Sequence, residues 1–138
     1  MKTRHLFYTV LSLVLTACSS VPYTQRLAER QADYAATAGD PVPSFRYTTD
    51  LYSWEAVSDT QVAVYTKPLQ AYLLDLGAKC PDLLSNYDIG LTASFGKVTP
   101  RFDKVLTGAR HIPCMIQQIR PVDVQKLREL REKRKAKT

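Results

Sequence analysis

The chain has 138 residues, 45% of them hydrophobic, which is enough for one domain with a modest core and too few for two domains of ordinary size. Its formal net charge is +6, from 19 Lys and Arg against 13 Asp and Glu. The sequence has no glycine-rich phosphate loop, no Gly-x-Ser-x-Gly turn and no Cys and His cluster at zinc spacing, which excludes the recognisable forms of those nucleotide, hydrolase and metal sites.

The N-terminus has the layout of an export signal. Lys2 and Arg4 precede an apolar stretch over 6–17 that is too short and too polar to span a membrane. The stretch ends in Leu15-Thr16-Ala17-Cys18, which resembles the lipobox of a bacterial lipoprotein. The resemblance implies cleavage before Cys18 and lipid on that cysteine. The alternative is an ordinary secretory signal that happens to contain a cysteine.

The same resemblance implies an address. Lipoproteins of this type usually carry more than one acyl chain, and two or more chains anchor a protein stably. Residue 19 is Ser rather than Asp, which in the sorting rule of Gram-negative lipoproteins favours the outer membrane. We therefore expect a protein that is lipid-anchored in the cell envelope, at the outer membrane and facing the periplasm.

A short polar tether and a helix follow the signal. Thr24 is a candidate N-cap of a helix that ends at Gly39 and places Leu27, Tyr34 and Ala35 on one face. Two prolines, at positions 41 and 43, then stiffen the chain.

Strand-like alternation begins after these prolines. It covers 45–51 and, after a slip of register that predicts a bulge or bend, 52–56. Residues 61–66 form the next predicted strand, with Val62 and Val64 on one face and Ala63 and Tyr65 on the other. The run over 71–76 fits a strand with Tyr72 and the two leucines at 74 and 76 inward, or a short helix; we favour the strand because Gly77 follows a short run.

The second half of the chain repeats the pattern. Cys80-Pro81 opens a turn and one helical turn, residues 88–94 form a strand, and Phe95-Gly96-Lys97 forms a turn. A short strand is expected around Phe102 and Val105, and a last strand runs from Ile112 to Pro121. Asp123 is a good N-cap for a C-terminal helix, which we expect to fray beyond Leu130 because little apolar follows.

These elements indicate an α+β protein that is mainly β. We expect a small curled antiparallel sheet, or a partly open barrel, of about five or six strands with a helix at each end. The predicted organisation is a signal peptide over 1–17, a lipidated tether and N-terminal helix over 18–44, a β-rich domain over 45–121, and a basic C-terminal helix or tail over 122–138.

The chain has three cysteines, an odd number for an exported protein. Lipidation of Cys18 leaves Cys80 and Cys114, which we expect to form a disulfide in an oxidising periplasm. Three other interpretations stay open at this stage: free buried thiols, a zinc site that includes His111, and a catalytic thiol at Cys114. The zinc site lacks further ligands, and the thiol lacks a residue that would orient His111.

Several segments together resemble a family of small Gram-negative lipoproteins that is catalogued as a domain of unknown function. The match covers roughly residues 27–130. It includes Trp54, Cys-Pro-Asp-Leu at 80–83, Arg-Phe-Asp at 101–103 and Ile-Arg-Pro-Val-Asp at 119–123. The resemblance implies no chemistry, so no catalytic residue is carried over.

Positive charge is concentrated at the C-terminus. From Lys126 onward there are seven basic and two acidic residues, so the rest of the chain after the signal is nearly neutral. The side chains that could contact anionic lipid headgroups or an acidic partner are Arg128, Arg131, Lys133, Arg134, Lys135 and Lys137. A solvated helix end is the alternative. Nucleic acid is an unsuitable partner for an exported protein.

Two further groups are candidates. Arg101 and Asp103, with Arg110 and Arg120 nearby, fall at predicted strand ends and form either a ligand contact or a buried structural ion pair, and we favour the ion pair. Aromatic residues could line a ligand groove or pack in the core, which we favour; they are Tyr52, Trp54, Tyr65 and Tyr72.

No residue is marked as catalytic, and no metal or cofactor site is indicated. We therefore expect a membrane-anchored periplasmic lipoprotein whose domain binds an envelope protein or an anionic lipid. The alternative is a small-ligand carrier or weak enzyme that uses a pocket in the curled sheet.

Overall fold

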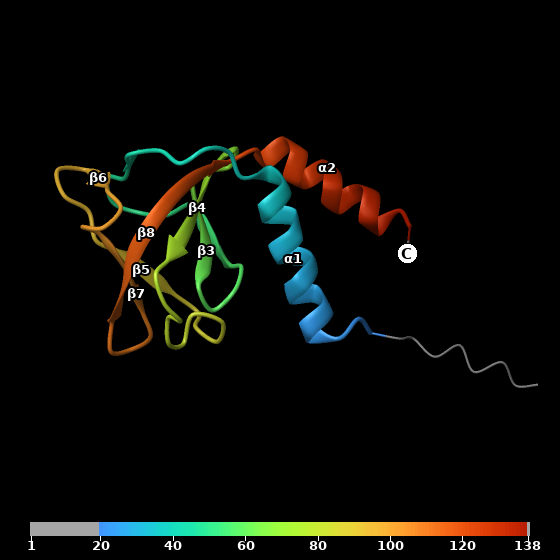
Figure 1. Ribbon diagram of the computed structural model, residues 1–138, viewed down its shortest axis with the longest axis horizontal. Helices are drawn as coiled ribbons and strands as arrows, with labels where there is room; N and C mark the ends of the chain where they lie inside the picture. Colours follow the sequence, from blue (N-terminus) through green and yellow to red (C-terminus); the bar gives the residue numbers. More distant parts are fainter. Residues whose placement is uncertain (1–19, 138) are drawn as a thin grey trace, which may run out of the picture.

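The computed structural model of the protein describes residues 20–137. A six-stranded antiparallel sheet curls into half a barrel, and two helices lie together at one end of the molecule (Figure 1). The predicted α+β class, with a mainly β domain and a helix near each end of the chain, is confirmed. Cys18 lies outside the described residues.

The sheet has the strand order β2-β3-β4-β8-β7-β5. Its strands are β2 (Ser53–Ala56), β3 (Gln61–Lys67), β4 (Gln70–Leu76), β5 (Ile89–Leu91), β7 (Lys104–Thr107) and β8 (Ile112–Val122). Register shifts between Tyr65 and Lys67 and between Asp75 and Leu76 interrupt the ladders, and such irregularities bend strands. The long strand β8 pairs with both β4 and β7, so it connects the two halves of the sheet.

Side chains alternate between the two faces of β3 and β4, so these strands contribute to two hydrophobic cores. Val62, Val64 and Leu74 face the concave side, where they join a cluster that includes Val105, Ile116 and Ile119. Ala63 and Leu73 face the helices, where they join Tyr34 and Leu127. The predicted faces of residues 62–65 and the strand at 71–76 are therefore confirmed. All buried members of both clusters lie between residues 34 and 127.

The segment between the prolines and β3 divides between two sheets. Only β1 (Phe45–Arg46) forms from the predicted strand over 45–51, and it pairs with β6 (Lys97–Val98) rather than with the main sheet. β2 then joins β3 after an irregular stretch. The register slip in the sequence thus marks a full change of sheet. The strand β5 is likewise shorter than the predicted 88–94, because Ser94 pairs with Lys97 across a tight turn.

The helices differ from expectation at their ends. α1 (Tyr23–Thr37) begins after Pro22, without a side-chain cap at Thr24, and ends before Gly39. α2 (Val124–Lys135) begins as predicted, with the Asp123 carboxylate accepting a hydrogen bond from the Lys126 amide at 3.0 Å. The expected fraying beyond Leu130 is wrong, because the helix continues to Lys135.

Candidate functional site: a charged helix clamp and a cationic sheet end

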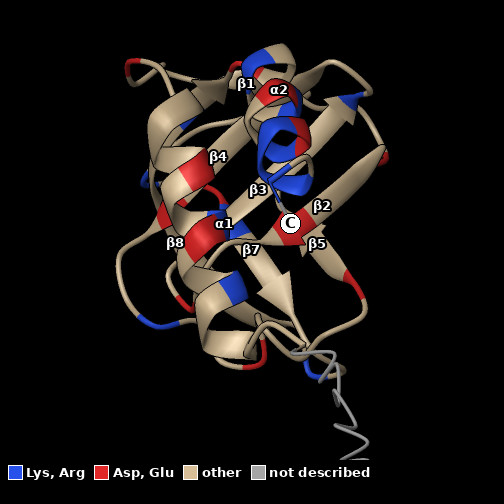
Figure 2. Cartoon of the chain, turned by 90° about the vertical axis from the view of Figure 1, so that its right-hand side faces the viewer, with Lys and Arg blue, Asp and Glu red and all other residues tan. Residues whose placement is uncertain are grey.

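Ion pairs between α1, β2 and α2 explain why the last turns of α2 stay helical. Figure 2 looks onto these helices and shows Lys and Arg concentrated on the C-terminal turns of α2. We call the cluster formed by Arg30, Asp33, Tyr34, Glu55, Tyr65, Arg131 and Arg134 the helix clamp. Its hydrogen-bonded pair Asp33 and Arg134 is 101 residues apart in the chain.

Asp33 is the acceptor that holds the end of α2. Its residue is only 4% exposed, and its carboxylate accepts hydrogen bonds from both terminal nitrogens of Arg134, one of them at 2.9 Å. The Nε atom of Arg131 lies 3.6 Å from the same carboxylate. A buried carboxylate without such partners would be costly, so the two arginines and Asp33 stabilise one another.

Glu55, on the edge strand β2, is the second acceptor. Its carboxylate contacts Arg131 at 2.9 Å, Arg30 at 3.0 Å and the Tyr34 hydroxyl at 2.6 Å. The Tyr34 and Tyr65 hydroxyls lie 2.9 Å apart, and the Arg131 guanidinium carbon lies 5.4 Å from the centre of the Tyr34 ring. Arg131 therefore joins α2 to both the sheet and α1.

Contacts within the helix clamp raise the pKa of three of its members. Burial, reinforced by the hydrogen bond with Glu55, raises the pKa of Tyr34 well above its ordinary value. Burial disfavours the charge of Arg131, but its hydrogen bond and charge interaction with Glu55 outweigh burial and raise its pKa. The hydrogen bond with Asp33 raises the pKa of Arg134. All three groups therefore keep their protons at neutral pH.

A groove of about 270 Å³ runs along the clamp. The groove is lined by Arg26, Glu29, Arg30, Asp33, Glu55, Arg131, Arg134 and Lys135. Three of these residues are acidic and five are basic, so most of the positive charge is neutralised inside the groove. The arrangement suits fixing α2 against the domain better than holding a multiply charged anion.

Most of the basic side chains of the tail that were predicted to contact anions are therefore bonded to groups of the protein itself. Besides the two clamp arginines, Arg128 donates to the Pro68 carbonyl at 3.1 Å and Lys135 pairs with Glu132 at 3.1 Å. Lys133 is exposed. Hydrophobic periodicity could not reveal this, because the residues that hold α2 are charged on both sides of the contact.

Arg101 and Asp103 are not brought together as the favoured ion pair. Asp103 is buried, and its carboxylate accepts hydrogen bonds from the Thr92 hydroxyl at 2.9 Å and the Thr99 amide at 2.8 Å. Arg101 is exposed, and its backbone has a φ of +68°. Asp103 closes its own turn with uncharged donors, so the sequence neighbour Arg101 is left to solvent.

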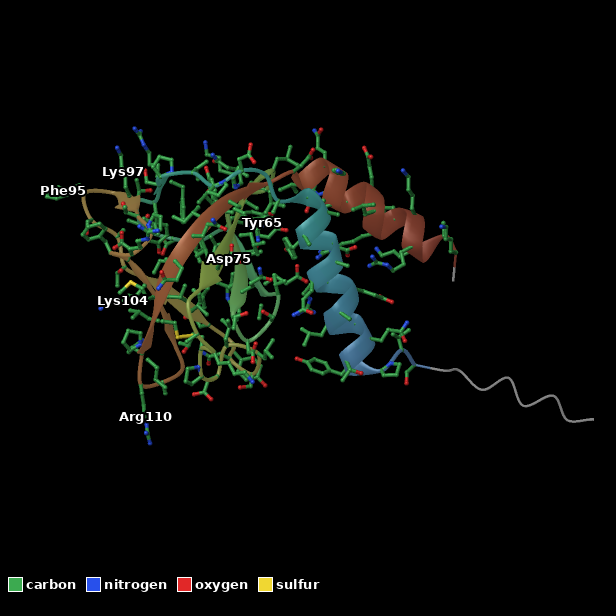
Figure 3. The ribbon with its side chains drawn as sticks, in the orientation of Figure 1. Tyr65, Asp75, Phe95, Lys97, Lys104 and Arg110 are labelled. Carbon is green, nitrogen blue, oxygen red and sulfur yellow. A yellow bond between two sulfur atoms is a disulfide. The ribbon has the colours of Figure 1, made fainter. Side chains whose placement is uncertain are left out.

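Several other cations occupy the same stretch of the chain as Arg101. Between Ile89 and Ile119 the basic residues are Lys97, Arg101, Lys104 and Arg110, and Asp103 is the single acid. Within the described residues none of the four has a salt bridge or a side-chain hydrogen bond. Two phenylalanines of the same stretch, Phe95 and Phe102, are also exposed. We call these six residues the cationic end; Figure 3 shows Phe95, Lys97, Lys104 and Arg110 along the end of the molecule opposite the helices.

The four aromatic candidates do not line one groove. Tyr72 stacks on Phe45 with 4.4 Å between ring centres, and half-buried Trp54 packs against the same concave core. Tyr65 belongs to the helix clamp, whereas Tyr52 is exposed. The favoured core role thus fits Trp54 and Tyr72. The concave face itself is filled by the core; a hollow of about 370 Å³ lined by residues that include Tyr47 and Tyr72 lies beside it.

Cys80 and Cys114 form a disulfide, with 5.7 Å between their Cα atoms. It ties the turn after β4 to β8, and both cysteines belong to the concave core. The zinc and catalytic-thiol interpretations of Cys114 are therefore wrong for this form of the protein. His111, with a φ of +49°, is exposed in the turn before β8.

Two other site types, a metal centre and a membrane-spanning helix, have no candidate among the described residues. Among residues 20–137, no three His, Cys, Asp or Glu side chains are grouped so that they could hold a metal ion. Neither helix in this part of the chain combines the length and the apolar character needed to cross a bilayer.

Comparisons with known proteins place the chain in a family without assigning chemistry to it. Searches of curated proteins and of solved structures returned no match. A family model described as a family of unknown function (DUF6491) matches residues 1–138, the whole chain. The resemblance to a family of unknown function is therefore confirmed, and the protein belongs to the DUF6491 family.

Proposed function

We propose that this protein is a lipid-anchored domain of the bacterial cell envelope that acts by binding an anionic partner rather than by catalysis. The observation that carries the binding role is the cationic end. Four basic side chains there have no internal acceptor among the described residues. Asp103 beside them is buried, and the exposed acids Asp82 and Asp88 lie only near the turn that carries Arg110. Unneutralised charge of one sign on a surface attracts ligands of the opposite sign.

The anchor and the location rest on the cysteines. The lipobox-like segment places Cys18 only five residues before the first residue of α1, so a lipid there would hold the domain close to the membrane. The Cys80–Cys114 bridge suits an oxidising compartment, and disulfides are rare in reducing ones. Together these features support an exported protein with one modified and two paired cysteines.

The anchor is tested by replacing Cys18 with Ala in cells labelled with radioactive palmitate. We expect loss of the label and loss of the protein from washed membranes, with a Ser19→Ala variant as the control that keeps both. Undiminished labelling of the Cys18→Ala protein would refute the anchor.

The binding role is tested by salt elution of the domain from residue 19 onward on a dextran sulfate resin. The test pair, Lys97→Glu with Lys104→Glu, reverses two charges at the cationic end. The control pair, Lys126→Glu with Lys133→Glu, makes the same change of net charge on α2. We expect the first pair to elute at clearly lower salt than the second. Equal elution of the two pairs would show that net charge alone determines retention.

A further inference from the structure

We infer that the cationic end is a second membrane contact, at which Phe95 enters the interface of an anionic phospholipid bilayer while the surrounding cations lie at the headgroups. This inference rests on the proposed function and names the partner of its binding surface.

Phe95 occupies a position that folding does not favour. It forms the tip of a two-residue hairpin with Gly96, closed by hydrogen bonds of 2.9 and 3.1 Å between Ser94 and Lys97. Both tip residues have positive φ, +54° and +71°, a conformation for which Asn, Asp and Gly are preferred. The phenyl ring is also fully exposed. Neither the strained backbone at Phe95 nor its exposed ring stabilises the folded domain. This combination points to burial of the ring against a partner.

Phe102 repeats this arrangement on the next turn. It is 77% exposed and follows Arg101, which also has positive φ. Two apolar tips thus project from two separate turns. A fluid bilayer interface receives separate tips without preformed cavities, whereas a protein partner would need a matching pocket for each. Aromatic side chains with neighbouring Lys and Arg are the combination that favours a membrane interface.

The distribution of charge fits a broad surface. Lys97, Lys104 and Arg110 lie along the whole end of the molecule rather than converging on one point (Figure 3). Such a spread matches many headgroups at once and suits a small anion poorly. Because each cation acts at short range, contact requires this end to approach the bilayer closely.

The anchor permits this contact. The N-terminus of α1 lies at the end opposite Phe95 (Figures 1 and 3). Five residues from Cys18 to Tyr23 reach at most about 17 Å when extended. A domain tethered in this way can lie along the membrane, with the lipid at one end and, at the other, the edge of the cationic end that carries Phe95 and its neighbouring cations. The second contact would then fix the orientation of the domain.

The test measures co-sedimentation of the domain from residue 19 onward, whose cores are made of residues 34–127, with vesicles of phosphatidylethanolamine and phosphatidylglycerol at 3:1. Phe95→Asn removes the ring but improves the turn, so the variant stays folded. Leu69→Asn, in the exposed turn between β3 and β4, is its control. Circular dichroism checks the fold of each variant.

We expect binding to these vesicles and none to pure phosphatidylcholine. Phe95→Asn should weaken the partition coefficient by roughly tenfold or more, and Leu69→Asn should leave it unchanged. Lys97→Glu with Lys104→Glu should weaken it by roughly 25-fold or more, whereas Lys126→Glu with Lys133→Glu should not.

Absent vesicle binding, or equal binding by Phe95→Asn and Leu69→Asn, would overturn the inference. If dextran sulfate still distinguished the two lysine pairs, the proposed anionic binding would stand and the partner would be an acidic protein or polymer. If the resin also failed to distinguish them, the proposed binding function would fall as well.

Discussion

Replacing Asp33 with Asn tests whether the helix clamp holds α2 in place. The substitution keeps the size of the side chain but removes the charge that Arg131 and Arg134 share. Asp33 itself is 4% exposed, whereas the side chains of Arg131 and Arg134 are 33% and 40% exposed. The arginines can therefore regain water when the carboxylate is lost.

This exposure sets the expected magnitude. Breaking a fully buried ion pair costs about 3–5 kcal/mol, but solvent reaches both arginines here, so we expect a loss of about 1–3 kcal/mol of unfolding free energy. For a domain of this size that corresponds to a melting temperature lower by about 4–12 °C. Urea titration measures the free energy, and amide hydrogen exchange should show faster exchange from Arg131 onward with little change in β4 and β8.

Glu29→Ala provides the matched control. Glu29 is also on α1 and also approaches Arg134, but at 3.9 Å and with a side chain 34% exposed. We expect a change below about 0.5 kcal/mol. If Asp33→Asn costs no more than this control and the amides of α2 stay protected, the ion pairs do not hold the helix, and the reasoning is wrong.

Three further predictions concern stability. Cys80→Ala with Cys114→Ala should lower the unfolding free energy by about 2–5 kcal/mol, and a denaturant midpoint no lower than that of the parent would contradict a stabilising bridge. The pKa of Tyr34 is raised from 10.0, so above pH 10 Tyr34 ionises in the unfolded chain but not in the folded protein. The unfolding free energy should therefore fall above pH 10 by about 1.4 kcal/mol per pH unit. Urea titrations from pH 9 to 11.5 measure this slope, and Tyr34→Phe should remove the part that Tyr34 contributes. Asp103→Ala should lower the unfolding free energy by about 1–3 kcal/mol, because the Thr99 amide loses its acceptor. Arg101→Ala should lower it by less than about 0.5 kcal/mol. Similar shifts of melting temperature for the two variants would restore the ion-pair interpretation.

Local patterns predicted the parts of the fold that are set locally. Alternation placed Val62 and Val64 opposite Ala63 and Tyr65, because side chains alternate along any strand. Asp123 was identifiable as a helix cap, because its acceptor serves an amide three residues ahead. The cysteine count pointed to the Cys80–Cys114 bridge.

Contacts between distant charged residues could not be predicted in the same way. Asp33 and Arg134 are far apart in sequence, and no periodicity links them. The same limit applies to Asp103, where the sequence suggests an arginine partner and the turn supplies a hydroxyl and an amide instead. The cationic end likewise appears only when separate turns are placed at one end of the sheet. A signal was nevertheless present in Phe95, an unusual residue for the tip of a predicted turn.

The most direct test of the lipid-anchored binding domain is the intact mass of the protein purified from the cell envelope without reducing agent. We predict a chain that begins at Cys18, carries a mass increment for a diacylglyceryl group with or without a further acyl chain, and lacks two hydrogens because Cys80 and Cys114 are joined. A chain that begins elsewhere, or that begins at an unmodified Cys18, would contradict the account.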